Sequence, residues 1–75
     1  SFSDAQLAKL RKEFEPLRDK GEKNKEMMAK LKNQMRRYPR DALKTLAKSD
    51  IPMVSKNARS ILAPFGRMKE EKDNV

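Results

Sequence analysis

The spacing of apolar residues predicts helices along most of the chain, because they recur every three or four positions and nowhere alternate with polar residues as in a strand. Leu7, Leu10 and Phe14 follow this spacing and share one face of a first helix. Ser3 and Gln6 have the spacing of a capping box at the start of that helix.

Pro16 interrupts this first pattern. A proline inside a helix lacks a donor and clashes with the carbonyl four residues earlier, so we expect the helix to end or kink near Phe14, with Gly21 as a natural stop. The apolar face nevertheless repeats as heptads through Tyr38, so a continuous coiled coil is an alternative. A proline beside that seam and a glycine within it would cost about 3 and 1 kcal/mol. We therefore expect a helical hairpin that bends at residues 16–21.

Three further helices are expected. The second covers residues 22–38, Pro39 ends it and begins a third over 40–48, and Ser49 and Asp50 offer caps for a fourth over 52–63. The residues expected to be buried are Met27, Met28, Leu31, Met35 and Tyr38 in the second helix, Ala42, Leu43, Leu46 and Ala47 in the third, and Val54, Ala58, Ile61, Leu62 and Phe65 in the fourth. The sequence predicts an all-α fold, a small bundle of three to four short helices in which a helical hairpin precedes two shorter helices.

One small domain is expected, because 75 residues with 36% apolar and 40% charged side chains can form only a thin core. Pro64 and Gly66 punctuate the end of the fourth helix. We expect residues 1–66 to form a single helical domain, part of a larger protein, and residues 67–75 to form a solvated tail.

The composition argues against catalysis, metal binding and membrane insertion. The chain has no His and no Cys, which removes the commonest general base, the thiol nucleophile, disulfides and the usual zinc ligands. Its two glycines are 45 residues apart and cannot form a phosphate-cradling loop. We expect no enzymatic activity, no cofactor, no metal and no membrane-spanning segment, and an intracellular protein, either cytoplasmic or nuclear.

The charge favours an anionic partner. The chain carries 19 Lys and Arg against 11 Asp and Glu, a net charge of +8. Residues 21–48 hold nine of the basic and three of the acidic groups, a net +6, whereas the segments on either side are each +1. We therefore expect a small basic module that binds nucleic acid, DNA or RNA, mainly through phosphate contacts from residues 23–48.

Two groups of polar residues are candidates for these contacts. Around the break at Pro39 the candidates are Lys32, Arg36, Arg37, Arg40, Lys44 and Lys48, in which the arginine forks suit phosphate. The segment LAKSDIPMVSKNARSIL also has the outline of a helix-turn-helix, whose second helix would expose Ser55, Lys56, Asn57 and Arg59. Aromatic residues make up only 5% of the chain, so the composition gives little support to recognition of single strands by base stacking.

The alternative function is protein–protein interaction. Such a domain would dock an acidic partner, or form a homodimer, through an adaptable methionine-rich stripe. That stripe consists of Met27, Met28, Leu31 and Met35, which internal packing would also explain.

The opening FSDAQLAKLR resembles the start of the QLQ motif of some chromatin remodellers, with Phe2, Gln6, Leu7 and Leu10 in matching places. Glu13 stands where that motif tends to have glutamine, and the proline-bearing continuation of the motif is not evident. The capping box already explains these residues physically, so no family is assigned.

Overall fold

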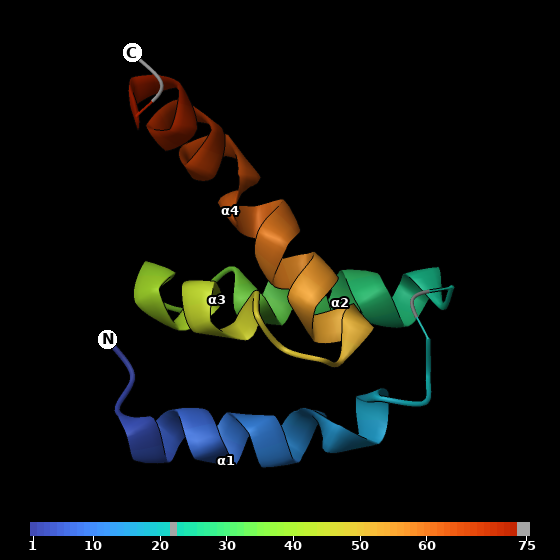
Figure 1. Ribbon diagram of the computed structural model, residues 1–75. Helices are drawn as coiled ribbons and strands as arrows, with labels where there is room; N and C mark the ends of the chain where they lie inside the picture. The colour runs from blue at the N-terminus through green and yellow to red at the C-terminus, as the bar shows by residue number, and fades with distance from the viewer. Residues whose placement is uncertain (22, 74–75) are drawn as a thin grey trace.

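The computed structural model describes the backbone of residues 1–21 and 23–73 and the side chains of residues 1–21 and 23–65. Within that part of the chain the fold is all-α and contains no strand, as the sequence predicts (Figure 1). The elements are α1 (Asp4–Phe14), a short 3-10 turn η1 (Glu15–Leu17), α2 (Lys25–Met35), α3 (Arg40–Leu46) and α4 (Pro52–Asp73).

The predicted capping box and hairpin are both confirmed. Ser3 Oγ accepts from the backbone N–H of Gln6 at 3.2 Å, and Gln6 Oε1 accepts from the N–H of Ser3 at 2.7 Å. Helix α1 ends at Phe14, Pro16 lies in η1, and α2 returns alongside α1 in the opposite direction (Figure 1). The chain reverses around Gly21, which has a φ of +70°, so the continuous coiled coil is wrong.

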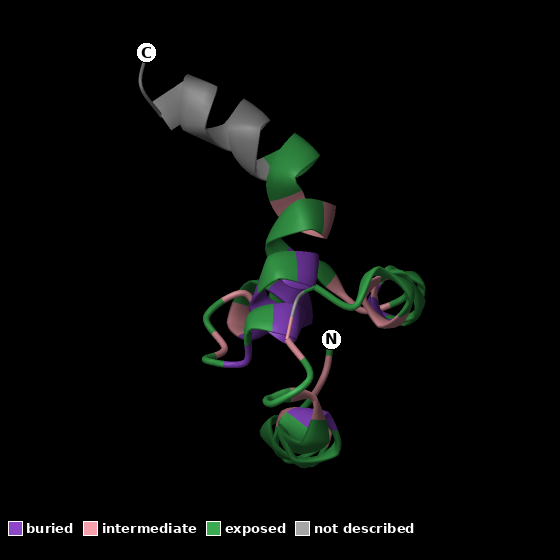
Figure 2. Ribbon diagram, turned by 90° about the vertical axis from the view of Figure 1, so that its right-hand side faces the viewer, coloured by how far each residue is buried: buried purple, intermediate pink, exposed green. Residues whose placement is uncertain are grey.

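The core lies where α4 packs against α2 and α3 (Figure 2). Its largest fully buried side chains are Met35, Leu46, Met53 and Val54. Helix α1 contributes Phe14, which is buried. The hydrophobic core is thus built mainly from the three later helices.

Helix α2 is shorter than predicted. It begins at Lys25, because Asn24 acts as N-cap and its Oδ1 accepts from the N–H of Met27 at 3.1 Å. It ends at Met35, and a turn follows before Pro39 caps α3. In that turn the Tyr38 ring is half-buried and meets the edge of the Phe2 ring at a centroid distance of 5.3 Å.

The predicted end of the fourth helix at residue 63 is wrong, because α4 continues through Pro64 to Asp73. A single proline removes one helical hydrogen bond, and the sequence RMKEEKD after Gly66 consists mostly of strong helix formers. The backbone of the predicted tail is thus helical as far as Asp73, whereas its predicted solvation lies outside the described side chains and stays a prediction.

Phe65 is also misplaced by the prediction, since it is 50% exposed. It lies on the same face of α4 as Val54 and Ala58, which are fully buried, but two to three turns further along the helix. Burial declines along this face, and Ile61 and Leu62, which lie between Ala58 and Phe65, are only half-buried. Phe65 therefore lies beyond the part of α4 that α2 and α3 cover.

Candidate nucleic-acid interface

A row of cations runs along the outer side of α3. Arg40 and Lys44 are four residues apart and share a helix face, and Lys48 follows by another four in the turn that ends α3. All three side chains are exposed, and the opposite face of α3 is buried in the core through Leu43 and Leu46. The row therefore faces solvent along its length.

Helix α4 adds two cations to this side of the molecule. Lys56 and Arg59 are exposed and three residues apart, on the face of α4 opposite its buried residues. Arg59 Nε donates to the backbone carbonyl of Ala47 at 3.2 Å, at the end of α3. This bond holds the Arg59 guanidinium beside the residue that precedes Lys48, so the two cation rows meet.

A second contact fixes how α3 and α4 run past each other. The guanidinium carbon of Arg40 lies 4.2 Å from the centre of the Phe65 ring. Arg40 begins α3 and Ala47 follows its end, whereas Phe65 lies later in α4 than Arg59. Helix α4 therefore runs back past α3, and Arg40 and Arg59 both lie where the two helices contact each other.

Lys32 reaches α4 from the other side. Its Nζ donates to the hydroxyl of Ser60 at 2.7 Å, and Ser60 is one helical turn after Lys56 on the exposed face of α4. Five exposed cations therefore lie on α3, the following turn and α4, with Lys32 at their edge. We call Arg40, Lys44, Lys48, Lys56 and Arg59 the α3–α4 basic surface.

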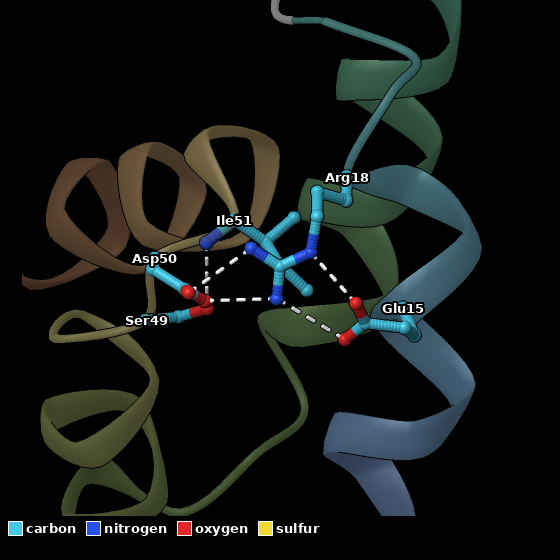
Figure 3. Close-up of polar contacts among 5 residues, drawn as sticks. All are labelled: Glu15, Arg18, Ser49, Asp50 and Ile51. Carbon is cyan, nitrogen blue, oxygen red and sulfur yellow. Dashed lines mark hydrogen bonds and ion pairs between the residues drawn. The ribbon is translucent and has the colours of Figure 1, made fainter.

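Acidic groups are scarce around this surface. Residues 40–65 contain only Asp41 and Asp50 as acids. Asp50 is already engaged, because its carboxylate accepts from both terminal nitrogens of Arg18, at 3.0 and 3.1 Å (Figure 3). Asp41 is the remaining acid, and its Oδ1 accepts from the N–H of Ala42 at 2.9 Å. Within residues 40–65 basic side chains thus outnumber acidic ones, five to two.

Arg18 joins two carboxylates at once. Its Nε donates to Glu15 Oε1 at 2.7 Å, while its terminal nitrogens bind Asp50, 32 residues further along the chain (Figure 3). Hydrogen bonding to the guanidinium lowers the pKa of both Glu15 and Asp50, and the same bonds raise the pKa of Arg18. Neither predicted cap bonds to an N–H within α4: Asp50 binds Arg18, and the hydroxyl of Ser49 accepts from the N–H of Ile51, which precedes the helix, at 3.1 Å.

Two predicted arginines, Arg36 and Arg37, lie in the turn that follows α2 and not on α3 or α4. Arg36 donates back along α2 to Asn33 Oδ1 at 3.4 Å, whereas Arg40 reaches across to α4, so the two arginines engage different elements. Arg37 is exposed in the turn after α2.

The expected exposure of Asn57 and Ser55 is wrong. Asn57 is 3% exposed and Ser55 is 7% exposed, because both lie on the side of α4 that packs against the bundle. The Asn57 amide donates to the backbone carbonyl of Met28 at 3.1 Å. The recognition helix of a helix-turn-helix would need these side chains outside, so that interpretation keeps only Lys56 and Arg59.

The methionine-rich stripe is mostly internal. Met35 and Leu31 are 0% and 6% exposed and belong to the core. Met27 and Met28 are half-buried and pack against it. Met27 also lines an open groove of about 300 Å³ between α1 and α2, with Phe14 and Leu31. Of the four residues in the stripe, only Met27 and Met28 are therefore partly accessible to a partner.

Other ligand chemistry has little to build on in the described part of the chain. No three acidic side chains there are grouped closely enough to hold a metal ion. Of the helices described, none combines the length and the apolar character needed to cross a membrane. No family of known proteins, no curated protein and no solved structure matches the chain, so its own residues carry the functional argument.

Proposed function

We propose that this chain is a small basic helical module that binds nucleic acid through phosphate contacts from the α3–α4 basic surface. The observation that carries the proposal is the bond from Arg59 Nε to the carbonyl of Ala47, which joins the cations of two helices into one surface. Five exposed cations on two packed helices and the turn between them, with only two acids in the same stretch of sequence, suit a polyanion better than a single acidic residue.

The α3–α4 basic surface leaves out several cations of the 23–48 segment that charge alone predicted. Residues 23–48 include Lys30, which pairs with Glu26 at 3.7 Å, and Lys23 and Lys25 at the far end of α2. In the proposed function the main contacts shift toward α3 and the first half of α4. Lys32 stays at the edge of the interface through its bond to Ser60.

Salt dependence tests the proposal. Five neutralised phosphates predict a log–log slope of affinity against salt of about −4.5 on duplex and about −3.5 on single strands. The measurement is fluorescence anisotropy of labelled DNA and RNA with the 75-residue chain, from about 50 to 200 mM salt. Affinity that is absent, or that does not change with salt, would refute the proposal.

A matched pair of variants locates the surface. Lys44→Gln, Lys48→Gln and Lys56→Gln together should weaken binding and reduce the duplex slope by about 2.7. Lys9→Gln, Lys12→Gln and Lys20→Gln remove the same net charge from exposed positions on α1 and the turn after it. If the two triple variants lose the same affinity and slope, the interface is not on α3 and α4. Binding of an acidic protein in place of nucleic acid would favour the interaction-domain alternative.

A further inference from the structure

We infer that the Arg40–Phe65 pair forms a stacking site for an unpaired base, so that single-stranded nucleic acid is the preferred ligand of this surface. The inference rests on the proposed function and names its ligand class. It starts from the exposure of Phe65, the one large apolar side chain of the described residues that is markedly exposed, at 50%.

The Phe65 ring lies where a ligand bound to the α3–α4 basic surface can contact it. The Arg40 guanidinium lies over it at 4.2 Å, so the exposed aromatic group is adjacent to the α3–α4 basic surface. A strand whose phosphates follow Lys44 and Lys48 along α3 reaches Arg40 at the start of the helix. An unpaired base can then stack on the ring or on the planar guanidinium, since both present a flat face.

Duplex bases cannot use such a site, because their faces are already stacked on one another inside the helix. Base-edge recognition in the duplex also lacks its expected residue, since Asn57 is buried and bonded to Met28. The described surface therefore offers phosphate contacts to any nucleic acid and a stacking contact only to an unpaired base.

The energetic effect of one stack is measurable. An aromatic–base stack contributes roughly a 5- to 150-fold change in affinity when the ring is removed. Phe65 is half-exposed and lies outside the buried core, so its replacement should leave the fold intact. Circular dichroism of each variant checks that the helices are retained.

The experiment compares three probes with the full chain: an oligothymidine of about 12 nucleotides, the same strand with abasic sugars replacing its bases, and the matched duplex. We expect the oligothymidine to bind more tightly than the abasic strand. Phe65→Leu should remove roughly 5- to 150-fold of affinity for the oligothymidine only, and Phe65→Trp should retain it. Arg40→Lys keeps the charge and should selectively weaken the same probe.

The control is Lys44→Gln, which removes a charge and no ring and should weaken all three probes alike. Equal binding of the oligothymidine and the abasic strand, or an unchanged affinity in Phe65→Leu, would overturn the stacking site while leaving phosphate binding in place. Failure of the wild-type chain to bind any probe would overturn both proposals.

Discussion

The side-chain amide of Asn57 donates to the backbone carbonyl of Met28 at 3.1 Å and so ties α4 to α2. The same nitrogen lies 3.7 Å from the Met28 sulfur. Asn57 is 3% exposed, so this is a buried polar link between two helices of the core. A bond of this kind fixes the register of α4 on α2, because an amide that shifts along the helix would lose its partner.

Replacing Asn57 should therefore destabilise the fold. Asn57→Ala removes the hydrogen bond and leaves a small void, which we expect to lower the free energy of unfolding by about 1–3 kcal/mol in urea titrations. Asn57→Asp should cost more at neutral pH, because it places a carboxylate against the Met28 carbonyl oxygen. The control is Lys44→Ala, an exposed position on α3 expected to stay within about 0.5 kcal/mol. Wild-type stability in Asn57→Asp would contradict this account.

The burial of Asn57 is predictable from the spacing of apolar residues along α4. It lies four residues after Met53 and four before Ile61, so helical spacing alone places it on the face of α4 that those two residues occupy. Residue type suggested a base-reading side chain, while position indicated the core. The positional signal was the correct one, because a helix has one orientation relative to its core.

Other features depend on contacts that no local pattern reports. The helices, the capping box at Ser3 and the bend before Gly21 follow from short-range spacing and were predictable. The meeting of Arg59 with the end of α3, and of Arg40 with Phe65, depends on how α4 crosses the bundle. Charge counting therefore found a basic segment but could not identify which cations share a surface.

The Arg18 network predicts a dependence of stability on pH. Because the guanidinium lowers the pKa of Glu15 and Asp50 in the folded state, their stabilisation is present above the unfolded-state pKa values, about 4.3 and 3.9, and is lost as the pH falls through the folded values. Arg18→Gln should lower Tm at pH 6 to 7, and the difference from wild type should shrink toward pH 2 to 3.

Thermal unfolding of both proteins across this range is the measurement. Lys20→Gln removes a charge two residues away that has no part in the network and serves as the control. All three groups of the network are substantially exposed, so added salt should also reduce the effect. A Tm difference that stays constant from pH 7 to pH 2 would mean that Arg18 acts through packing and not through the two carboxylates.

Replacing Gly21 should change stability through backbone conformation and not through packing. Its φ is +70°, and a Cβ added there would meet nothing within 4 Å. Gly21→Ala should therefore destabilise by about 1 kcal/mol through the left-handed conformation alone. Gly21→Asn should cost less, because asparagine tolerates this conformation. Urea titrations of the two variants decide the matter, and equal losses in both would argue against a conformational cause.

Ser60 provides a test of the α3–α4 basic surface, because it lies among the cations of that surface. Its hydroxyl accepts from Lys32 Nζ at 2.7 Å, and it lies one turn from Lys56 and next to Arg59. Ser60→Glu should place a carboxylate one turn from Lys56 that competes with phosphate for this cation, so nucleic-acid affinity should fall and the duplex salt slope should lose about one unit. Ser60→Ala removes only the neutral hydroxyl and should bind as the wild type does.

The control for net charge is Ala8→Glu, which adds the same charge to the exposed side of α1 and should change affinity much less. If Ala8→Glu weakens binding as much as Ser60→Glu, net charge and not the α3–α4 basic surface determines affinity.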